Sequence, residues 1–285
     1  MTLLSHPLVQ TIAIPIVLAF VVAGLLRLVA GHERGRGLAA IGVGLGMLAA
    51  YAATFGIPAF PPVGSTNKLF YVVVVALAVG ILCDIARWPV SATGPLAALA
   101  ALGGGLWIGG AKALDEPWPW GLAVVIVLTV GAGAAWRLAR HRENPTEGGV
   151  MVLVAAIAIS GTAFLANTAS SAQLAGATAA ALGGFLLWNW PKAQFPLGGG
   201  ALLPAMALLT ALAVQMVLFT RIEAYALVPL ALVFVADLAA RRLSLGAGAV
   251  AQALRPVVLA LIAAVPAAAA VALVYLTLPQ SSGGS

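Results

Sequence analysis

Between Lys68 and Asp84 the chain reads L-F-Y-V-V-V-V-A-L-A-V-G-I-L-C, without one charged side chain. Apolar runs of this kind, each about twenty residues long, recur from one end of the chain to the other. A helix of about 20 apolar residues crosses a hydrocarbon core roughly 30 Å thick and pairs its backbone N–H and C=O groups internally. These runs therefore predict membrane-spanning helices.

The composition excludes a water-soluble globular protein. Hydrophobic residues make up 62% of the 285 positions and charged residues only 8%, with a mean hydropathy of +1.09. Soluble domains carry about a quarter charged residues. The apolar runs also lack the alternation and the length of about ten residues that are typical of outer-membrane β-strands. We expect an all-α, polytopic membrane protein.

About ten transmembrane helices are expected, in a single domain that covers residues 1–280. Their approximate bounds are 7–31, 37–57, 68–87, 93–111, 119–140, 149–167, 172–190, 200–219, 224–240 and 256–278. The serine- and glycine-rich residues 281–285 are expected to be a flexible tail or the remnant of an expression tag.

Basic residues are divided unevenly between alternate loops. The even-numbered loops carry only Lys68, Lys112 and Arg221 of the 14 basic residues. The odd-numbered loops and the adjoining span ends carry the rest: Arg27, Arg34, Arg36, Arg87, Arg137, Arg140, Arg142, Lys192, Arg241, Arg242 and Arg255. Because cytoplasmic loops are enriched in Lys and Arg, this bias places the odd loops in the cytoplasm. Both termini are then expected in the periplasm and the protein in the bacterial inner membrane.

Several function classes find no support in the sequence. The net charge of +6 comes from dispersed basic residues, so it reflects topology and gives no indication of nucleic-acid binding. One cysteine, Cys83, excludes an intramolecular disulfide framework. The chain contains no nucleophile elbow, no P-loop and no Cys/His cluster with metal-ligand spacing. The polar residues instead collect in the odd loops, where a cytoplasmic substrate and a membrane lipid could meet.

Residues 182–201 read L-G-G-F-L-L-W-N-W-P-K-A-Q-F-P-L-G-G-G-A, at the end of the expected seventh span and in the following loop. This stretch resembles the motif G-F-L-x-x-N-x-x-P-A-x-x-F-x-G-D-x-G-S of the polyprenyl-phosphate N-acetylhexosamine-1-phosphate transferases. That family includes the phospho-N-acetylmuramoyl-pentapeptide translocase. Three weaker matches occur in the family's order: G-R-G-L-A-A-I at 35–41, G-I-L-C-D at 80–84 and N-P-T-E-G-G at 144–149.

The resemblance covers roughly residues 7–278, mainly as topology. It implies ten or eleven spans, an active site built from cytoplasmic loops, and transfer of a sugar-1-phosphate from a UDP-sugar to a polyprenyl phosphate. It also implies Mg²⁺ held by loop acids, because a metal must neutralise the phosphates that approach one another.

Most of the acids of that family are replaced here. Cys83 stands at the first aspartate of the third-loop pair, and Asp84 at the second. Glu147 stands at the fifth-loop aspartate, and Gly198 at the metal-binding aspartate of the seventh loop. The stretch 241–255 contains no histidine, whereas the family's ninth loop is histidine-rich.

We therefore expect a divergent, catalytically impaired member of this family that binds a polyprenyl-phosphate-type lipid in envelope glycan or cell-wall synthesis. By the resemblance, any remaining catalysis or Mg²⁺ binding falls to Asp84 and Glu147. The expected contacts to the lipid phosphate or a UDP-sugar are Arg36, Asn144, Asn189 and Lys192. A homodimer or an envelope-assembly protein is the expected protein partner.

Two alternatives stay open. The chain could be an active glycosyl-1-phosphate transferase with a reduced Asp/Glu site. It could also be a ten-helix transporter for a small molecule, since five spans per half give the opposite orientations that inverted repeats require. Against the transporter, the expected spans carry no Asp, Glu or Lys at mid-membrane to couple ions.

Overall fold

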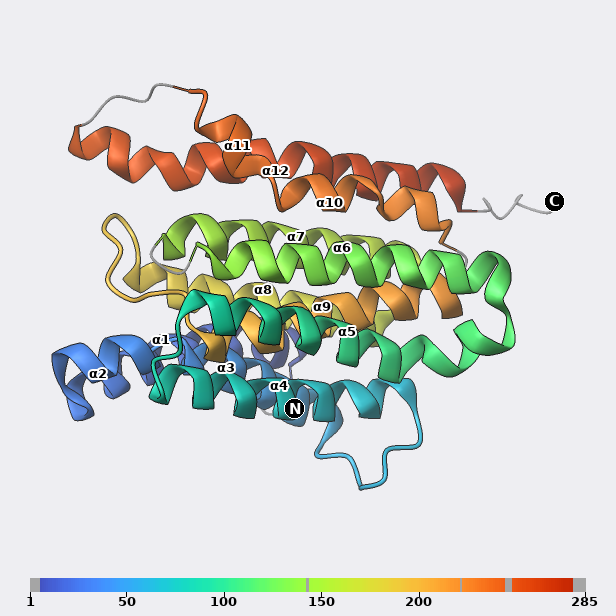
Figure 1. The fold of residues 1–285 in the computed structure, drawn as a ribbon, viewed down its shortest axis with the longest axis horizontal. Coiled ribbons are helices and arrows are strands. Elements are labelled where there is room, and N and C mark those ends of the chain that lie inside the picture. The colour runs from blue at the N-terminus through green and yellow to red at the C-terminus, as the bar shows by residue number, and fades with distance from the viewer. Residues whose placement is uncertain (1–5, 142–143, 221, 244–247, 279–285) are drawn as a thin grey trace.

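The computed structural model of the chain describes residues 6–141, 144–220, 222–243 and 248–278. Within these residues every regular element is a helix. Nine of the described helices are long and apolar enough to cross a membrane, which is the architecture of a polytopic membrane protein (Figure 1). The all-α prediction is confirmed for this part of the chain.

The helices follow one another with short connections. In chain order they are η2 (Val9–Ala13), α1 (Ile14–Val29), α2 (Gly31–Leu38), α3 (Ile41–Phe55), α4 (Ser65–Ile85), α5 (Val90–Asp115), η3 (Pro117–Gly121), α6 (Leu122–Ala139), α7 (Pro145–Leu165), α8 (Ala169–Trp188), α9 (Gly199–Phe219), η4 (Ala224–Leu227), α10 (Pro229–Val233), α11 (Ala236–Ala240) and α12 (Ala249–Thr277). The expected tail at 281–285 lies outside the described residues.

At the expected span 224–240 the structure has no single long helix, so nine of the described helices, and not ten, are long enough to cross a membrane by themselves. This stretch forms three short pieces, η4, α10 and α11. Pro229 accounts for the first break, because proline has no N–H and starts a new helical turn. The second break is at Val235, just before Asp237, whose carboxylate is bound by Arg137 of α6. The three pieces still run beside α12 from one end of the bundle to the other (Figure 1).

The segments expected in the cytoplasm gather at one end of the bundle. At the left of Figure 1 lie α2, the first turn of α7, the segment 189–198 and α11. The opposite end holds η3 and the start of α4, which the charge pattern assigns to the other side. The fold thus separates the basic segments from the others, as a two-sided membrane topology requires.

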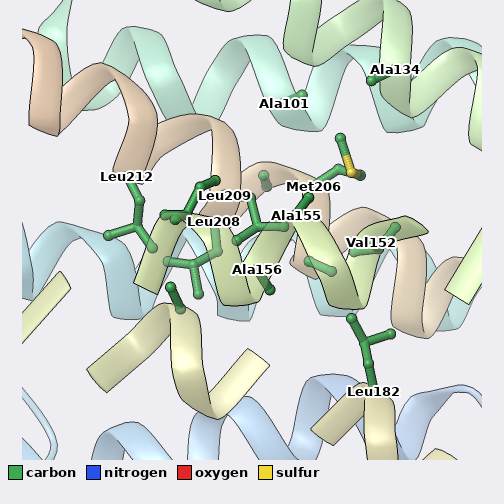
Figure 2. Packing of buried hydrophobic residues seen from close by; sticks show 14 of the residues in the cluster. Ala101, Ala134, Val152, Ala155, Ala156, Leu182, Met206, Leu208, Leu209 and Leu212 are labelled. Carbon is green, nitrogen blue, oxygen red and sulfur yellow. The ribbon is translucent and has the colours of Figure 1, made fainter. Parts of the chain in front are cut away.

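α9 runs through the middle of the bundle and is the most deeply buried of the nine long helices described. Apart from Thr210 and Gln215 its side chains are apolar all round, as expected for a helix surrounded by others. Figure 2 shows Met206 and the leucines of α9 among small side chains of neighbouring helices, including Ala101, Ala134 and Ala155. Gly80 of α4 lies so close to the Gly199 carbonyl that a β-carbon has no room there. This approach places the first turn of α9 against the end of α4.

Candidate functional site

A pocket of about 630 Å³ opens among the polar segments at the basic end of the bundle. We call it the loop pocket. Its walls are Arg36, Gly37, Asp84, Arg87, Trp88, Pro89, Val90, Pro145, Ala193, Gln194, Phe195 and Pro196. These residues come from α2, the α4–α5 connection, the start of α7 and the segment before α9. The loop pocket therefore joins the four segments that carry the family resemblance.

Asp84 sits in the wall of the loop pocket and caps the first turn of α9. Its side chain is buried, and its two carboxylate oxygens accept the backbone N–H groups of Gly199 and Gly200, each at 2.8 Å. The first N–H groups of a helix have no partner within the helix, and the positive end of the helix dipole favours a carboxylate there. A β-carbon on Gly198 would lie 2.5 Å from Asp84 Oδ2, so glycine is the residue that leaves space for this cap.

Arg87 ends α4 in a left-handed backbone conformation with φ of 53°. The N–H of Trp88 donates to the Cys83 carbonyl at 3.0 Å, and the Arg87 N–H donates to the Asp84 carbonyl at 3.4 Å. This is the helix-ending motif in which glycine is the usual left-handed residue. A non-glycine residue with this φ costs roughly 1–3 kcal/mol, and such residues cluster at functional sites. The turn keeps an arginine at the edge of the loop pocket where glycine would be the stable choice.

The segment 189–198 is fixed by its own side chains and by two arginines. Asn189 is buried, and its Oδ1 accepts the N–H groups of Gln194 and Phe195, each at 2.8 Å. Arg36 Nε donates to the Gln194 carbonyl at 2.8 Å. The Arg27 guanidinium lies 5.7 Å from the centre of the buried Phe195 ring. One wall of the loop pocket is therefore held in a defined shape.

A second polar group, which we call the ionic cluster, joins α6, α7 and α11. Arg137 Nη2 donates to both carboxylate oxygens of Asp237, at 2.8 and 3.0 Å. His141 Nε2 lies 3.2 Å from Asp237 Oδ2. Arg241 Nη2 lies 3.4 Å from a carboxylate oxygen of Glu147 and 3.4 Å from one of Asp237. Asp237 is buried, so these contacts tie the broken helix to α6 and α7.

The described acids do not fit the Mg²⁺ that the resemblance implies. Magnesium requires oxygen ligands in near-octahedral geometry and keeps several waters. Both oxygens of Asp84 face backbone N–H donors at the start of α9. Ligand atoms of His141, Glu147 and Asp237 do lie within 4.8 Å of one another, but the guanidinium groups of Arg137 and Arg241 already supply positive charge there. The donor set of the described residues suits an anion at the loop pocket better than a divalent cation.

The predicted site residues fall in different places. Asp84 and Arg36 line the loop pocket, whereas Glu147 lines a separate pocket of about 230 Å³ beside the ionic cluster. Asn144 is exposed at the start of α7, and Lys192 is exposed on the segment 189–198.

Two features were missed at the sequence level. Arg87 is not among the predicted site residues, although Pro89 two residues later marks a helix end of the kind that holds a left-handed residue. Asp237 is likewise not among the residues that the sequence predicts for the site. A lone carboxylate in an apolar run, with arginines at the ends of other spans, is the signal that predicts such a pair.

Comparison of the chain with protein-family models, with curated proteins and with solved structures found no match.

Proposed function

We propose that the protein binds a polyprenyl-phosphate-type lipid through the loop pocket, as a divergent and catalytically impaired relative of the polyprenyl-phosphate sugar-1-phosphate transferases. In this proposal it acts in envelope glycan or cell-wall synthesis in the bacterial inner membrane. The broken stretch 224–240 completes a tenth crossing, so both termini face the periplasm.

The convergence of four separate segments on one pocket carries the proposal. α2, the α4–α5 connection, the start of α7 and the segment 189–198 are far apart in sequence, yet all contribute to the loop pocket. Two guanidinium groups, of Arg36 and Arg87, stand in its wall. Guanidinium groups match the geometry of phosphate oxygens and hold their charge at any physiological pH. A lipid phosphate is the anion that a pocket at the end of a membrane bundle would meet.

The use of the acids supports the loss of catalysis. Both oxygens of Asp84 accept N–H groups of the first turn of α9, and the Asp84 carboxylate leaves no space for an aspartate side chain at position 198, where the family motif has one. Phosphoryl transfer between two phosphates needs a cation between them. Retained phosphate binding without a metal-holding set is the combination expected of a binding or assembly subunit.

An active transferase with a reduced acidic site is the second candidate, because His141, Glu147 and Asp237 bring three ligand atoms within 4.8 Å of one another. Arg241 would have to leave Glu147 and Asp237 to admit Mg²⁺. The two candidates differ in turnover: purified protein with undecaprenyl phosphate, Mg²⁺ and UDP-N-acetylhexosamines should release no UMP, and clear release would establish the second candidate.

Binding is tested with undecaprenyl phosphate titrated into the full-length protein in phosphatidylcholine nanodiscs. Arg36→Gln and Arg87→Gln should each weaken binding about tenfold or more, since one hydrogen bond to a charged group is worth roughly 1.5–3 kcal/mol. Arg140→Gln removes an exposed arginine at the same end of the bundle and is the matched control. Equal affinities in all three variants and the parent protein would reject the loop pocket as the phosphate site.

A further inference from the structure

An apolar groove runs between α4 and α5 on the outer surface of the bundle. It has a volume of about 420 Å³. We call it the α4–α5 groove. It is lined by Val72, Val75, Ala76, Val79, Leu96, Leu99, Ala100, Gly103, Gly104 and Trp107. Val75 and Leu99 on its rim are 59% and 60% exposed. Both helices pack on α9, so the groove is the space that remains between them on the side facing away from the core.

The three consecutive glycines of α5, which are Gly103, Gly104 and Gly105, have different surroundings. A β-carbon on Gly104 would lie 2.9 Å from the Ala207 carbonyl oxygen of α9, so this glycine permits the close approach of α5 and α9. Gly105 is likewise in contact with side chains of α6 and α9. Gly103 is different, since a β-carbon there would meet nothing within 4 Å. Glycine at position 103 therefore leaves space in the groove, and the packing of the described helices does not require it.

A lysine stands at one end of the α4–α5 groove. Lys68 is one turn before Val72 on α4, and its Nζ lies 3.4 Å from the carbonyl oxygen of Trp107, which lines the groove. It is one of the three basic residues that the charge pattern assigns to the non-cytoplasmic side. From Lys68 to Val79, α4 rises roughly 16 Å at 1.5 Å per residue. That is about half of a hydrocarbon core roughly 30 Å thick, or the depth of one leaflet.

These features favour a lipid over a protein partner. A stable protein interface uses about 20–30 residues on each side. The α4–α5 groove offers only the ten lining residues named above, fewer than such an interface uses. A partner helix with its side chains would be about 10–12 Å across. A single acyl chain needs only a narrow apolar groove one leaflet deep, with its headgroup at the water interface. The lysine at the groove mouth selects a headgroup with negative charge.

We propose that the α4–α5 groove binds one acyl chain of an anionic diacyl phospholipid from the non-cytoplasmic leaflet, with the lipid phosphate at Lys68. This site is separate from the loop pocket and does not depend on the function proposed for it.

Native mass spectrometry of the full-length protein tests this site. The probes are dioleoylphosphatidylglycerol and dioleoylphosphatidylcholine, which share the same chains and differ in headgroup charge. Gly103→Leu fills the α4–α5 groove, and Gly133→Leu adds the same side chain at an open, exposed glycine of α6. Lys68→Gln removes the charge at the groove mouth.

The parent protein should retain phosphatidylglycerol more than phosphatidylcholine. Gly103→Leu should lower that retention about tenfold and Gly133→Leu should leave it unchanged, since several methylene contacts are lost only in the first. Lys68→Gln should lower phosphatidylglycerol retention about fivefold without changing phosphatidylcholine retention.

Three results would overturn the proposal. The first is unchanged retention in Gly103→Leu with normal helicity by circular dichroism. The second is an unchanged preference for phosphatidylglycerol in Lys68→Gln, which decides the matter even if Gly103→Leu fails to fold. The third is a dimeric parent protein that Gly103→Leu alone converts to a monomer, because a second copy would then occupy the groove.

Discussion

Gly198 lies against the carboxylate of Asp84, so close that a β-carbon on residue 198 would come within 2.5 Å of Oδ2. Asp84 in turn accepts the N–H groups of the two residues that follow Gly198 in the chain, Gly199 and Gly200. The acid of α4 and the glycine before α9 therefore form one structural unit, which fixes the start of the central helix.

The first prediction concerns an acid introduced at position 198. Gly198→Asp should destabilise the protein by about 3 kcal/mol or more, because it forces a second carboxylate against a buried first one. It should produce no UMP release with Mg²⁺ and a UDP-sugar. Gly64→Asp places the same side chain at an exposed glycine with open space around it, just before α4, where a carboxylate favours the helix start, so it should be at least as stable as the parent protein. Thermal unfolding in detergent compares the three proteins, and a stable Gly198→Asp protein with turnover would contradict the structural role of Asp84.

The second prediction uses the left-handed turn at Arg87. Arg87→Gly should be more stable than Arg87→Ala by about 1 kcal/mol, since glycine adopts φ of 53° without the clash that a β-carbon meets. Both variants should lose affinity for undecaprenyl phosphate, because both remove the guanidinium from the loop pocket. Unfolding midpoints and lipid titrations on the same preparations separate the two effects. Equal stability of the glycine and alanine variants would show that the backbone strain is relieved in solution.

The third prediction addresses the pair of Arg137 and Asp237. Arg137→Met leaves the buried carboxylate of Asp237 with weaker partners, and should cost about 3 kcal/mol of stability. Replacing both partners, as Arg137→Met with Asp237→Leu, should recover much of that loss because no charge is then left buried. Hydrogen exchange should locate the effect of the single variant in α10 and α11. A double variant less stable than either single variant would show that the pair itself stabilises the fold.

Much of the fold could be predicted because hydropathy reports directly on the solvent of each helix. The expected span at 200–219 differs from α9 by one residue at its start, and the span at 68–87 overlaps almost all of α4. The stretch 224–240 is also mostly apolar, so hydropathy predicts a span there. Hydropathy does not report the missing N–H at Pro229 or the hydrogen bond that Asp237 accepts from Arg137, which is distant in sequence.

The candidate site could be predicted only as a face and not as a set of contacts. The charge bias and the resemblance predict that Arg36 and Asp84 lie at one end of the bundle, and both line the loop pocket. The use of Asp84 as a cap depends on the approach of Gly80 to Gly199 across two helices, which is a property of packing. Asn189 was expected to contact a phosphate, yet its oxygen faces the N–H groups of Gln194 and Phe195. Such local partners follow from the turn that the chain makes after residue 189.

The last prediction tests which end of the bundle faces the cytoplasm. Cys83 is the only cysteine and is buried, so single cysteines introduced elsewhere can be labelled against a low background. Val63→Cys reports on the basic-poor end, where Val63 is 93% exposed, and Lys192→Cys reports on the basic end, where Lys192 is exposed. Because positively charged loops stay inside, a membrane-impermeant maleimide should label Val63→Cys in intact spheroplasts and Lys192→Cys only after lysis. Val63→Cys carries its own control, since lysis should not increase its labelling, and the reverse pattern would place the loop pocket on the periplasmic side, away from any cytoplasmic nucleotide sugar.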